Sequence, residues 1–223
     1  MIVAIDGPSG AGKSSVAKAV ATQLGFNCLD TGAMYRAIAW LALERNVSLD
    51  DARALEDIAR TQDISFGHVA GDPVPRRVFI GEYEVTNAIR TAEIDRSVSK
   101  VAAVSGVREA LVDQQRRIGN TGNYVVEGRD IGTVVFPHAA LKIFLTASNE
   151  ERARRRVLQN EQRGIGSVNY EEVLADIVAR DMLDSSRESS PLCAAADAIH
   201  MDSTDKPMDV VISDICELSR RAM

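Results

Sequence analysis

Short apolar runs alternate along the chain with longer stretches in which apolar residues recur every three or four positions. The first pattern predicts buried β-strands and the second predicts amphipathic helices. We expect strands at residues 2–6, 27–30, 124–127, 141–146 and 198–201. We expect helices at residues 13–24, 32–45, 50–61, 92–118, 149–162, 170–187 and 207–221. This alternation predicts an α/β fold, a parallel sheet flanked by helices on both faces.

One stretch breaks the alternation. Residues 64–85, ISFGHVAGDPVPRRVFIGEYEV, hold short alternating apolar segments separated by Gly, Asp and Pro. This pattern is typical of a small antiparallel sheet with hairpin turns. We therefore expect a small antiparallel β insertion in the α/β core.

The residues after the first strand, GPSGAGKSS, match the phosphate-loop pattern G-x-x-x-x-G-K-[ST]. A glycine-rich turn without a ligand would fit the same letters, but here a strand precedes the match and a helix follows it. Backbone N–H groups of such a loop converge on an anion, and the positive end of the helix adds to them. We expect ATP phosphates to be bound by Gly7, Pro8, Ser9, Gly10, Ala11, Gly12, Lys13, Ser14 and Ser15, with Mg²⁺ near Ser14.

Composition narrows the class of protein. Hydrophobic residues make up 45% and charged residues 26% of the chain, as in ordinary globular domains. The net charge of −6 argues against general binding to nucleic acid or membranes. Cys28, Cys193 and Cys216 lie far apart without metal-ligand spacing. Their spacing favours a reducing cytoplasm over a disulfide framework or a zinc site. Separately, we expect the protein to be a monomer.

The nature of the phosphoryl acceptor is open at this point. Transfer to a hydroxyl needs a general base, and Asp30 stands at the end of a predicted strand, where ligands of parallel sheets bind. Transfer to a nucleoside monophosphate needs no base, but two anionic phosphates must be held together by arginines. The chain has 21 arginines against five lysines. Candidates at strand ends or on one helix face are Arg36, Arg129, Arg180 and Arg187. Tyr35 beside them fits the core and the site equally well.

Two predicted helices late in the chain carry charged residues at spacings that fit a phosphate-binding site. Arg180, Asp184 and Arg187 recur at i, i+4 and i+7, so they share one helix face, as an exposed ladder of ion pairs also would. The segment EERARRR leads into a turn with Gly164 and Gly166. A basic, glycine-hinged helical hairpin is typical of a lid that closes over phosphates, although a solvated charged helix has the same composition.

Seven segments follow one another in a fixed order over essentially the whole chain. They are IDGPSGAGKSS, LDTGAMYRA, IRT, VSKVAAVSGVREALVDQQR, EGRDIGTVVFP, KIFLTAS and RD-x-x-DS-x-R-x-x-SPL-x-x-A-x-DA. In these segments the chain resembles bacterial cytidylate kinases, nucleoside monophosphate kinases that transfer the γ-phosphate of ATP to CMP or dCMP with Mg²⁺. The resemblance implies a P-loop kinase core at 1–30, 106–150 and 188–223, a monophosphate-binding region at 31–105 with the inserted sheet at about 64–90, and a short helical lid at 151–187.

The resemblance also implies roles for single residues. Lys13, Arg129, Arg155 and Arg180 would be catalytic, and Arg155 and Arg156 would also contact ATP. The substrate would be bound by Thr31, Arg36, Ser99, Arg108, Arg129, Asp130, Arg180, Asp184 and Arg187. In that set Ser99, Arg108, Asp130 and Arg187 would read cytosine and Asp184 would contact the sugar.

The chain departs from the family at two positions. Glu127 stands where the family usually has aspartate, which leaves its reach toward Mg²⁺ open, and Thr31 stands where serine is frequent. Two other functions stay open from the residues themselves. One is a kinase of small-molecule hydroxyls with Asp30 as base. The other is a P-loop ATPase that acts as a switch, with the inserted sheet as a partner surface.

Overall fold

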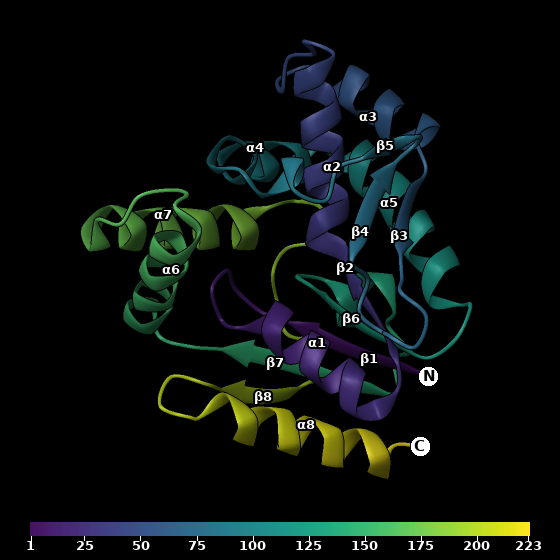
Figure 1. Cartoon of the computed structure of the whole chain (residues 1–223), viewed down its shortest axis with the longest axis vertical. Coiled ribbons are helices and arrows are strands. Elements are labelled where there is room, and N and C mark those ends of the chain that lie inside the picture. Colours follow the sequence, from purple (N-terminus) through teal and green to yellow (C-terminus); the bar gives the residue numbers. More distant parts are fainter.

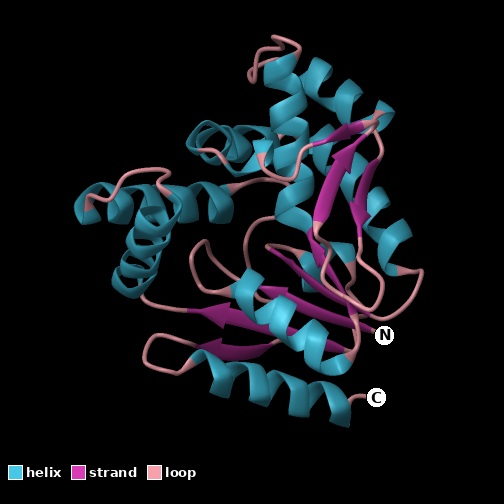
Figure 2. Cartoon of the chain, in the orientation of Figure 1, coloured by secondary structure: helices cyan, strands magenta, loops and turns pink.

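A five-stranded parallel sheet forms the centre of the molecule, and the computed structural model describes all 223 residues around it (Figures 1 and 2). The strand order is β2-β6-β1-β7-β8. The strands are β1 (Ile2–Asp6), β2 (Asn27–Asp30), β6 (Tyr124–Gly128), β7 (Leu141–Thr146) and β8 (Ile199–Asp202). Each strand lies within one residue of its predicted range, and the α/β fold class is confirmed.

The two faces of this sheet are covered by different helices. On one face α1 (Lys13–Leu24) and α8 (Met208–Arg221) pack side by side over Val3 and Ile5 of β1. On the other face Ala4 contributes to a larger core formed mainly by the helices and strands between residues 31 and 112. Successive side chains of a strand point to opposite faces, so a strand buried on both sides is apolar throughout. This is why β1 reads as a continuous apolar run.

The larger core includes the inserted sheet and four helices. Strands β3 (Ile64–Gly67), β4 (Arg77–Ile80) and β5 (Tyr83–Glu84) pair antiparallel in the order β3-β4-β5, which confirms the predicted insertion. Around it lie α2 (Thr31–Glu44), α3 (Ala52–Thr61), α4 (Ala92–Ala103) and α5 (Ser105–Gly119). Two short turns complete the inventory, the 3₁₀ turn η1 (Ala88–Arg90) and the π-turn η2 (Ile131–Val135).

The single helix expected at residues 92–118 is wrong. The chain leaves the helical conformation at Val104, whose φ of −77° and ψ of 117° are extended, and it re-enters a helix at Ser105. A β-branched valine followed by serine and glycine has low helix propensity, which permits this break. A helix end leaves carbonyl groups without intrahelical partners, so the break frees the carbonyl of Ala102 to accept hydrogen bonds from the side chains of Arg108 and Arg187.

Helices α6 (Asn149–Arg163) and α7 (Tyr170–Ser186) form a hairpin that projects to one side of the sheet (Figure 1). We refer to residues 149–186 as the helical hairpin. Gly164 ends α6 with φ of 63°, and Gly166 in the connecting turn has φ of 87°. Positive φ favours glycine, so these two positions allow the sharp reversal predicted from the sequence. A small core of its own, centred on Ala153, Val173 and Ile177, holds the two helices together.

The three cysteines lie in different surroundings. Cys28 and Cys216 are buried free thiols and Cys193 is an exposed one, so the cysteines form no disulfide. None of the helices combines the length and the apolar character needed to cross a bilayer.

Candidate active site

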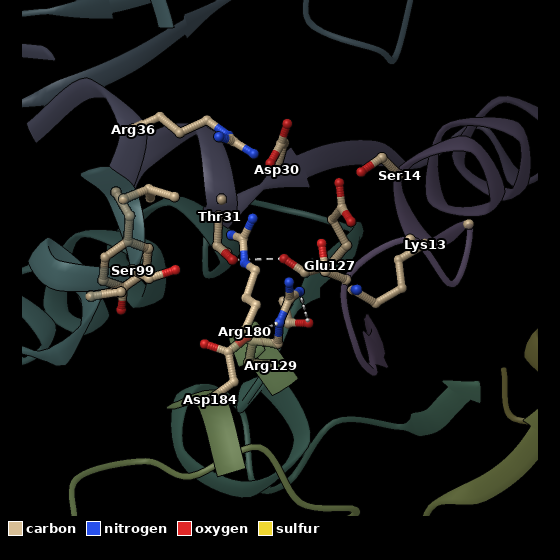
Figure 3. Close-up of a pocket in the computed structure, with 18 of the residues that line it drawn as sticks. Lys13, Ser14, Asp30, Thr31, Arg36, Ser99, Glu127, Arg129, Arg180 and Asp184 are labelled. Atoms are coloured by element: carbon tan, nitrogen blue, oxygen red, sulfur yellow. Dashed lines mark hydrogen bonds and ion pairs between the residues drawn. The ribbon is translucent and has the colours of Figure 1, made fainter. Parts of the chain in front are cut away.

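A cavity of about 340 Å³ lies beyond the carboxyl ends of β1, β2 and β6, next to the helical hairpin (Figure 3). Only four of its 27 lining residues are hydrophobic. The lining includes nine lysine or arginine residues and four aspartate or glutamate residues. A cavity with this excess of positive charge, in a protein whose net charge is −6, is suited to a ligand that carries several negative charges.

The structure brings most of the site residues expected from the sequence to this cavity. Gly7, Pro8 and Ala11 do not line it, because they form the back of the phosphate loop. The expected residues that line the cavity are Ser9, Gly10, Gly12, Lys13, Ser14, Ser15, Thr31, Arg36, Ser99, Arg108, Arg129, Asp130, Arg155, Arg156, Arg180, Asp184 and Arg187. The shared face of Arg180, Asp184 and Arg187 is therefore directed at the cavity rather than at solvent.

The phosphate loop is tightly bound to its surroundings. Gly7 has φ of 147°, and a Cβ there would lie 2.0 Å from the carbonyl oxygen of Leu145, so only glycine fits. Gly12 adopts φ of 92° immediately before α1. The Lys13 ammonium is buried and donates a hydrogen bond of 2.7 Å to the carbonyl of Pro8. Burial, reinforced by the positive charge of Arg129, lowers the pKa of Lys13 well below its usual value, so an anion beside Lys13 would stabilise its charged form.

A cation could be held beside this loop. Figure 3 shows the Ser14 hydroxyl and the Glu127 side chain directed at the same space. Burial, with a smaller contribution from Asp30, raises the pKa of Glu127, while Lys13 and a hydrogen bond from Ser14 lower it. No group of three acidic, histidine or cysteine residues forms a metal cluster. One carboxylate and one hydroxyl fit Mg²⁺, which takes its remaining ligands from nucleotide phosphates and water.

Arginines converge opposite the phosphate loop. Arg129 Nε donates to Asp184 Oδ2 at 2.9 Å, whereas Arg180 makes no ion pair within 4 Å and its buried Nε has no hydrogen-bond partner. Burial, together with the neighbouring charges of Arg129 and Arg36, lowers the pKa of Arg180 to about 10. A half-buried guanidinium without a counter-ion, whose Nε is buried and unpaired, is stabilised when an anion binds to it. Thr31 lies beside it, and its hydroxyl donates to the carbonyl of Glu127 at 2.7 Å.

The far end of the cavity contains a buried ion pair. Arg108 Nη2 donates to Asp130 Oδ2 at 2.5 Å, and the side chains are 3% and 6% exposed. The guanidinium carbon of Arg108 lies 5.3 Å from the centre of the Tyr35 ring, so Tyr35 is both buried and part of the site. The carbonyl of Ala102, freed by the helix break, accepts hydrogen bonds from Arg108 at 3.2 Å and from Arg187 at 3.5 Å. This end thus presents a carboxylate beside guanidinium donors.

Asp30, the candidate general base, is committed elsewhere. Its carboxylate caps α2 by accepting from the N–H of Ala33 at 2.9 Å, and it pairs with Arg90 at 2.8 Å. Burial alone would raise the pKa of Asp30, but the charge and the hydrogen bond of Arg90 outweigh burial and lower it. A carboxylate whose pKa is depressed is a weak base, so the geometry does not favour transfer to a hydroxyl.

Seven lining residues were given no role from the sequence, and two of them, Arg90 and Gln159, have long polar side chains. The other five are Gly32, Val98, Ala102, Gly128 and Met208. Arg90 belongs to the segment IRT, for which the resemblance implied no role. Its pairing with Asp30, 60 residues away in the chain, gives no local signal. Gln159 stands four positions after Arg155 on α6, and this helical spacing, which places both on one face, was the available signal.

Comparison with known proteins identifies the family. The family model described as cytidylate kinase matches residues 3–221. The chain is 50% identical over 216 residues to a protein named cytidylate kinase from Desulfitobacterium hafniense (strain Y51), covering 97% of this chain and 91% of that one. It is 48% identical over 219 residues to a bifunctional pantoate ligase/cytidylate kinase from Synechococcus sp. (strain CC9902), covering 98% of this chain.

The similarities extend over different shares of these proteins. The chain spans only 45% of the length of that bifunctional relative. A shikimate kinase from Bacteroides thetaiotaomicron superimposes with a TM-score of 0.51 at 12% identity, covering 99% of this chain and 98% of that one. At this identity the likeness supports the P-loop kinase fold alone. The family model and the cytidylate kinase relative extend over nearly the whole chain, and by these two matches the protein belongs to the cytidylate kinase family.

Proposed function

We propose that this protein transfers the γ-phosphate of ATP to CMP or dCMP, giving CDP or dCDP, and that ATP binds together with Mg²⁺. One observation carries this proposal. A single cavity has a phosphate loop at one end, a buried carboxylate–guanidinium pair at the other, and the unpaired Arg180 guanidinium between them. A nucleotide donor and a nucleotide acceptor can meet there with their phosphates adjacent.

The donor half is the phosphate loop together with the helical hairpin. Backbone N–H groups of residues 9–15 and the Lys13 ammonium hold the ATP phosphates, and Arg155 and Arg156 contact them from α6. Ser14 and Glu127 would hold Mg²⁺, which would neutralise charge on the phosphates when bound. Closure of the helical hairpin excludes water, so that the phosphoryl group goes to the acceptor.

The acceptor phosphate binds among Thr31, Arg36, Arg129 and Arg180. A phosphate monoester has a second pKa near 6 and is mostly a dianion at pH 7, so it attacks without a general base. The arginines and Lys13 offset the repulsion between the two anionic groups and stabilise charge on the transferring phosphoryl group.

The base is read by the buried pair at the far end. The Asp130 carboxylate accepts from the N4 amino group of cytosine, and Arg108 donates to N3. Ser99 and Arg187 complete the contacts to the base, and Asp184 contacts the sugar. Uracil would place its O4 acceptor against Asp130 and its N3–H donor against Arg108, so the site should reject UMP.

We assign the kinase core to residues 1–30, 106–150 and 188–223, the monophosphate-binding region to 31–105 and the lid to 151–187. We further propose that the enzyme works in the cytoplasm, where thiols stay reduced, because Cys28 and Cys216 are buried free thiols.

An assay of ADP release with a panel of acceptors tests the proposal. We expect activity with CMP and dCMP, kcat/KM for CMP that exceeds that for UMP by on the order of 10²- to 10⁴-fold, and almost no ADP without an acceptor. Small-molecule hydroxyls should be inactive, and Lys13→Ala provides the background rate. Equal rates with and without an acceptor would instead indicate an ATPase, and activity confined to hydroxyl acceptors would indicate the alternative kinase.

A further inference from the structure

Arg36, an arginine of the proposed acceptor-phosphate site, has a single polar partner. Its Nη1 donates to Asp95 Oδ1 at 2.6 Å, and it makes no other ion pair or side-chain hydrogen bond. Arg36 lies on α2 and is 13% exposed at the side chain, while Asp95 lies in the first turn of α4. The direction of this half-buried guanidinium is therefore set by one carboxylate from another helix.

Asp95 acts on Arg36 from outside the cavity. Arg36 lines the cavity and Asp95 does not. Figure 3 shows the Arg36 guanidinium directed toward the end of β2, at Asp30. Because Asp95 occupies only Nη1, the Nε and Nη2 donors stay free, and such a pair of donors matches two phosphate oxygens.

Burial and two neighbouring arginines disfavour the positive charge of Arg36, and Asp95 opposes them. Burial lowers the pKa of Arg36, and Asp95 is the strongest influence that opposes this, while Arg90 and Arg156 lower the pKa further and Asp30 raises it. The second oxygen of Asp95 lies 3.9 Å from Arg156 Nη1 on α6. Arg156 in turn donates to the Ser9 hydroxyl of the phosphate loop at 3.4 Å. One carboxylate thus lies between an arginine of the acceptor site and an arginine of the helical hairpin.

We propose that Asp95 is a positioning residue for the acceptor phosphate, which orients Arg36 toward the cavity. This inference rests on the proposed function only in that Arg36 binds the acceptor phosphate. Asp95 lies outside the cavity lining and acts through Arg36.

The test compares two isosteric substitutions in the same turn of α4. Asp95→Asn should raise KM for CMP about five- to tenfold, since the hydrogen bond that Arg36 donates loses the negative charge of its partly exposed acceptor. Its KM for ATP should stay within about twofold, which also shows that the variant is folded. Glu93→Gln is the matched control, because Glu93 is exposed, lies in the same first turn and makes no ion pair. It should leave KM for CMP unchanged.

A double substitution shows whether Asp95 acts through Arg36. In an Arg36→Ala background, Asp95→Asn should have no further effect on kcat/KM for CMP, which is measurable without saturation. The proposal is overturned if Asp95→Asn behaves like wild type, if Glu93→Gln has the same effect, or if the two losses at residues 36 and 95 are additive. A wild-type enzyme inactive with CMP would refute the proposed function instead, and the same comparison would then be made with whichever monophosphate it accepts.

Discussion

The buried pair of Arg108 and Asp130 connects stability to base selectivity. Its side chains are 3% and 6% exposed, and their atoms approach to 2.5 Å. Asp130→Asn keeps the shape of the side chain but leaves the Arg108 charge without a counter-ion. Breaking a buried pair in this way costs about 3–5 kcal/mol. For a chain of 223 residues, about 3 kcal/mol lowers Tm by roughly 6–12 °C.

The same substitution should weaken the choice between CMP and UMP. An asparagine amide can turn its carbonyl toward the N4 amino group of cytosine or its NH₂ toward the O4 of uracil. We therefore expect the ratio of kcat/KM values for CMP and UMP to fall at least about tenfold, mainly through loss of CMP activity. Thermal unfolding and steady-state kinetics measure the two effects. Asp113→Asn on α5, an exposed carboxylate, is the control and should change neither quantity.

A double substitution separates the two roles of the pair. Replacing a buried ion pair by apolar residues of similar size is often neutral or stabilising, so Arg108→Met with Asp130→Leu should regain most of the lost Tm. It should not regain CMP activity, because neither hydrogen bond to the base can form. The reasoning is refuted if Asp130→Asn melts within about 2 °C of wild type with an unaltered CMP-to-UMP ratio.

Three further outcomes are expected. Lys13→Ala should reduce kcat on the order of a hundredfold or more, while calorimetry shows nearly unchanged CMP binding; near-normal turnover would rule out the phosphate-loop role. Asp30→Asn should keep an appreciable rate at saturating substrates and lose about 1–2 kcal/mol of stability, since it caps α2 and pairs with Arg90; complete loss of turnover in a folded protein would indicate a hydroxyl kinase. Burial raises the pKa of Asp6 to about 6, above its unfolded value, so ionisation of Asp6 should destabilise the fold by roughly 3 kcal/mol as pH rises from about 4 to 6. Urea unfolding of Asp6→Asn should lack this pH-dependent loss, and parallel profiles for variant and wild type would contradict it.

The local features of this protein could be predicted from its sequence. The nine residues GPSGAGKSS suffice to predict the phosphate loop, because its glycines, its lysine and the start of the following helix are neighbours in the sequence. The buried strands were evident as apolar runs, since a sheet covered on both faces excludes polar side chains. Even the glycine hinge of the helical hairpin was visible, because positive φ at Gly164 and Gly166 favours one residue type.

Where local preference is weak, the surrounding structure decides. The segment around Val104 was predicted as continuous helix, because the apolar spacing persists through it. In the fold the chain breaks there, and the carbonyl of Ala102 accepts hydrogen bonds from Arg108 and Arg187. The low helix propensity of Val104, Ser105 and Gly106 permits a break but does not require one, so the packing of α4 and α5 decides.

The pairing of charges was decided by the tertiary structure alone. The sequence supplied the arginines of the site but not which of them have a carboxylate partner. Arg36 meets Asp95 across 59 positions of the chain and Arg129 meets Asp184 across 55, whereas Arg180 is left without a counter-ion. Ion pairs depend on distances of a few ångströms between elements far apart in sequence, and these distances exist only once the helices have packed. The sequence thus determined which chemistry is present, and the packing determined which guanidinium is free to bind a phosphate.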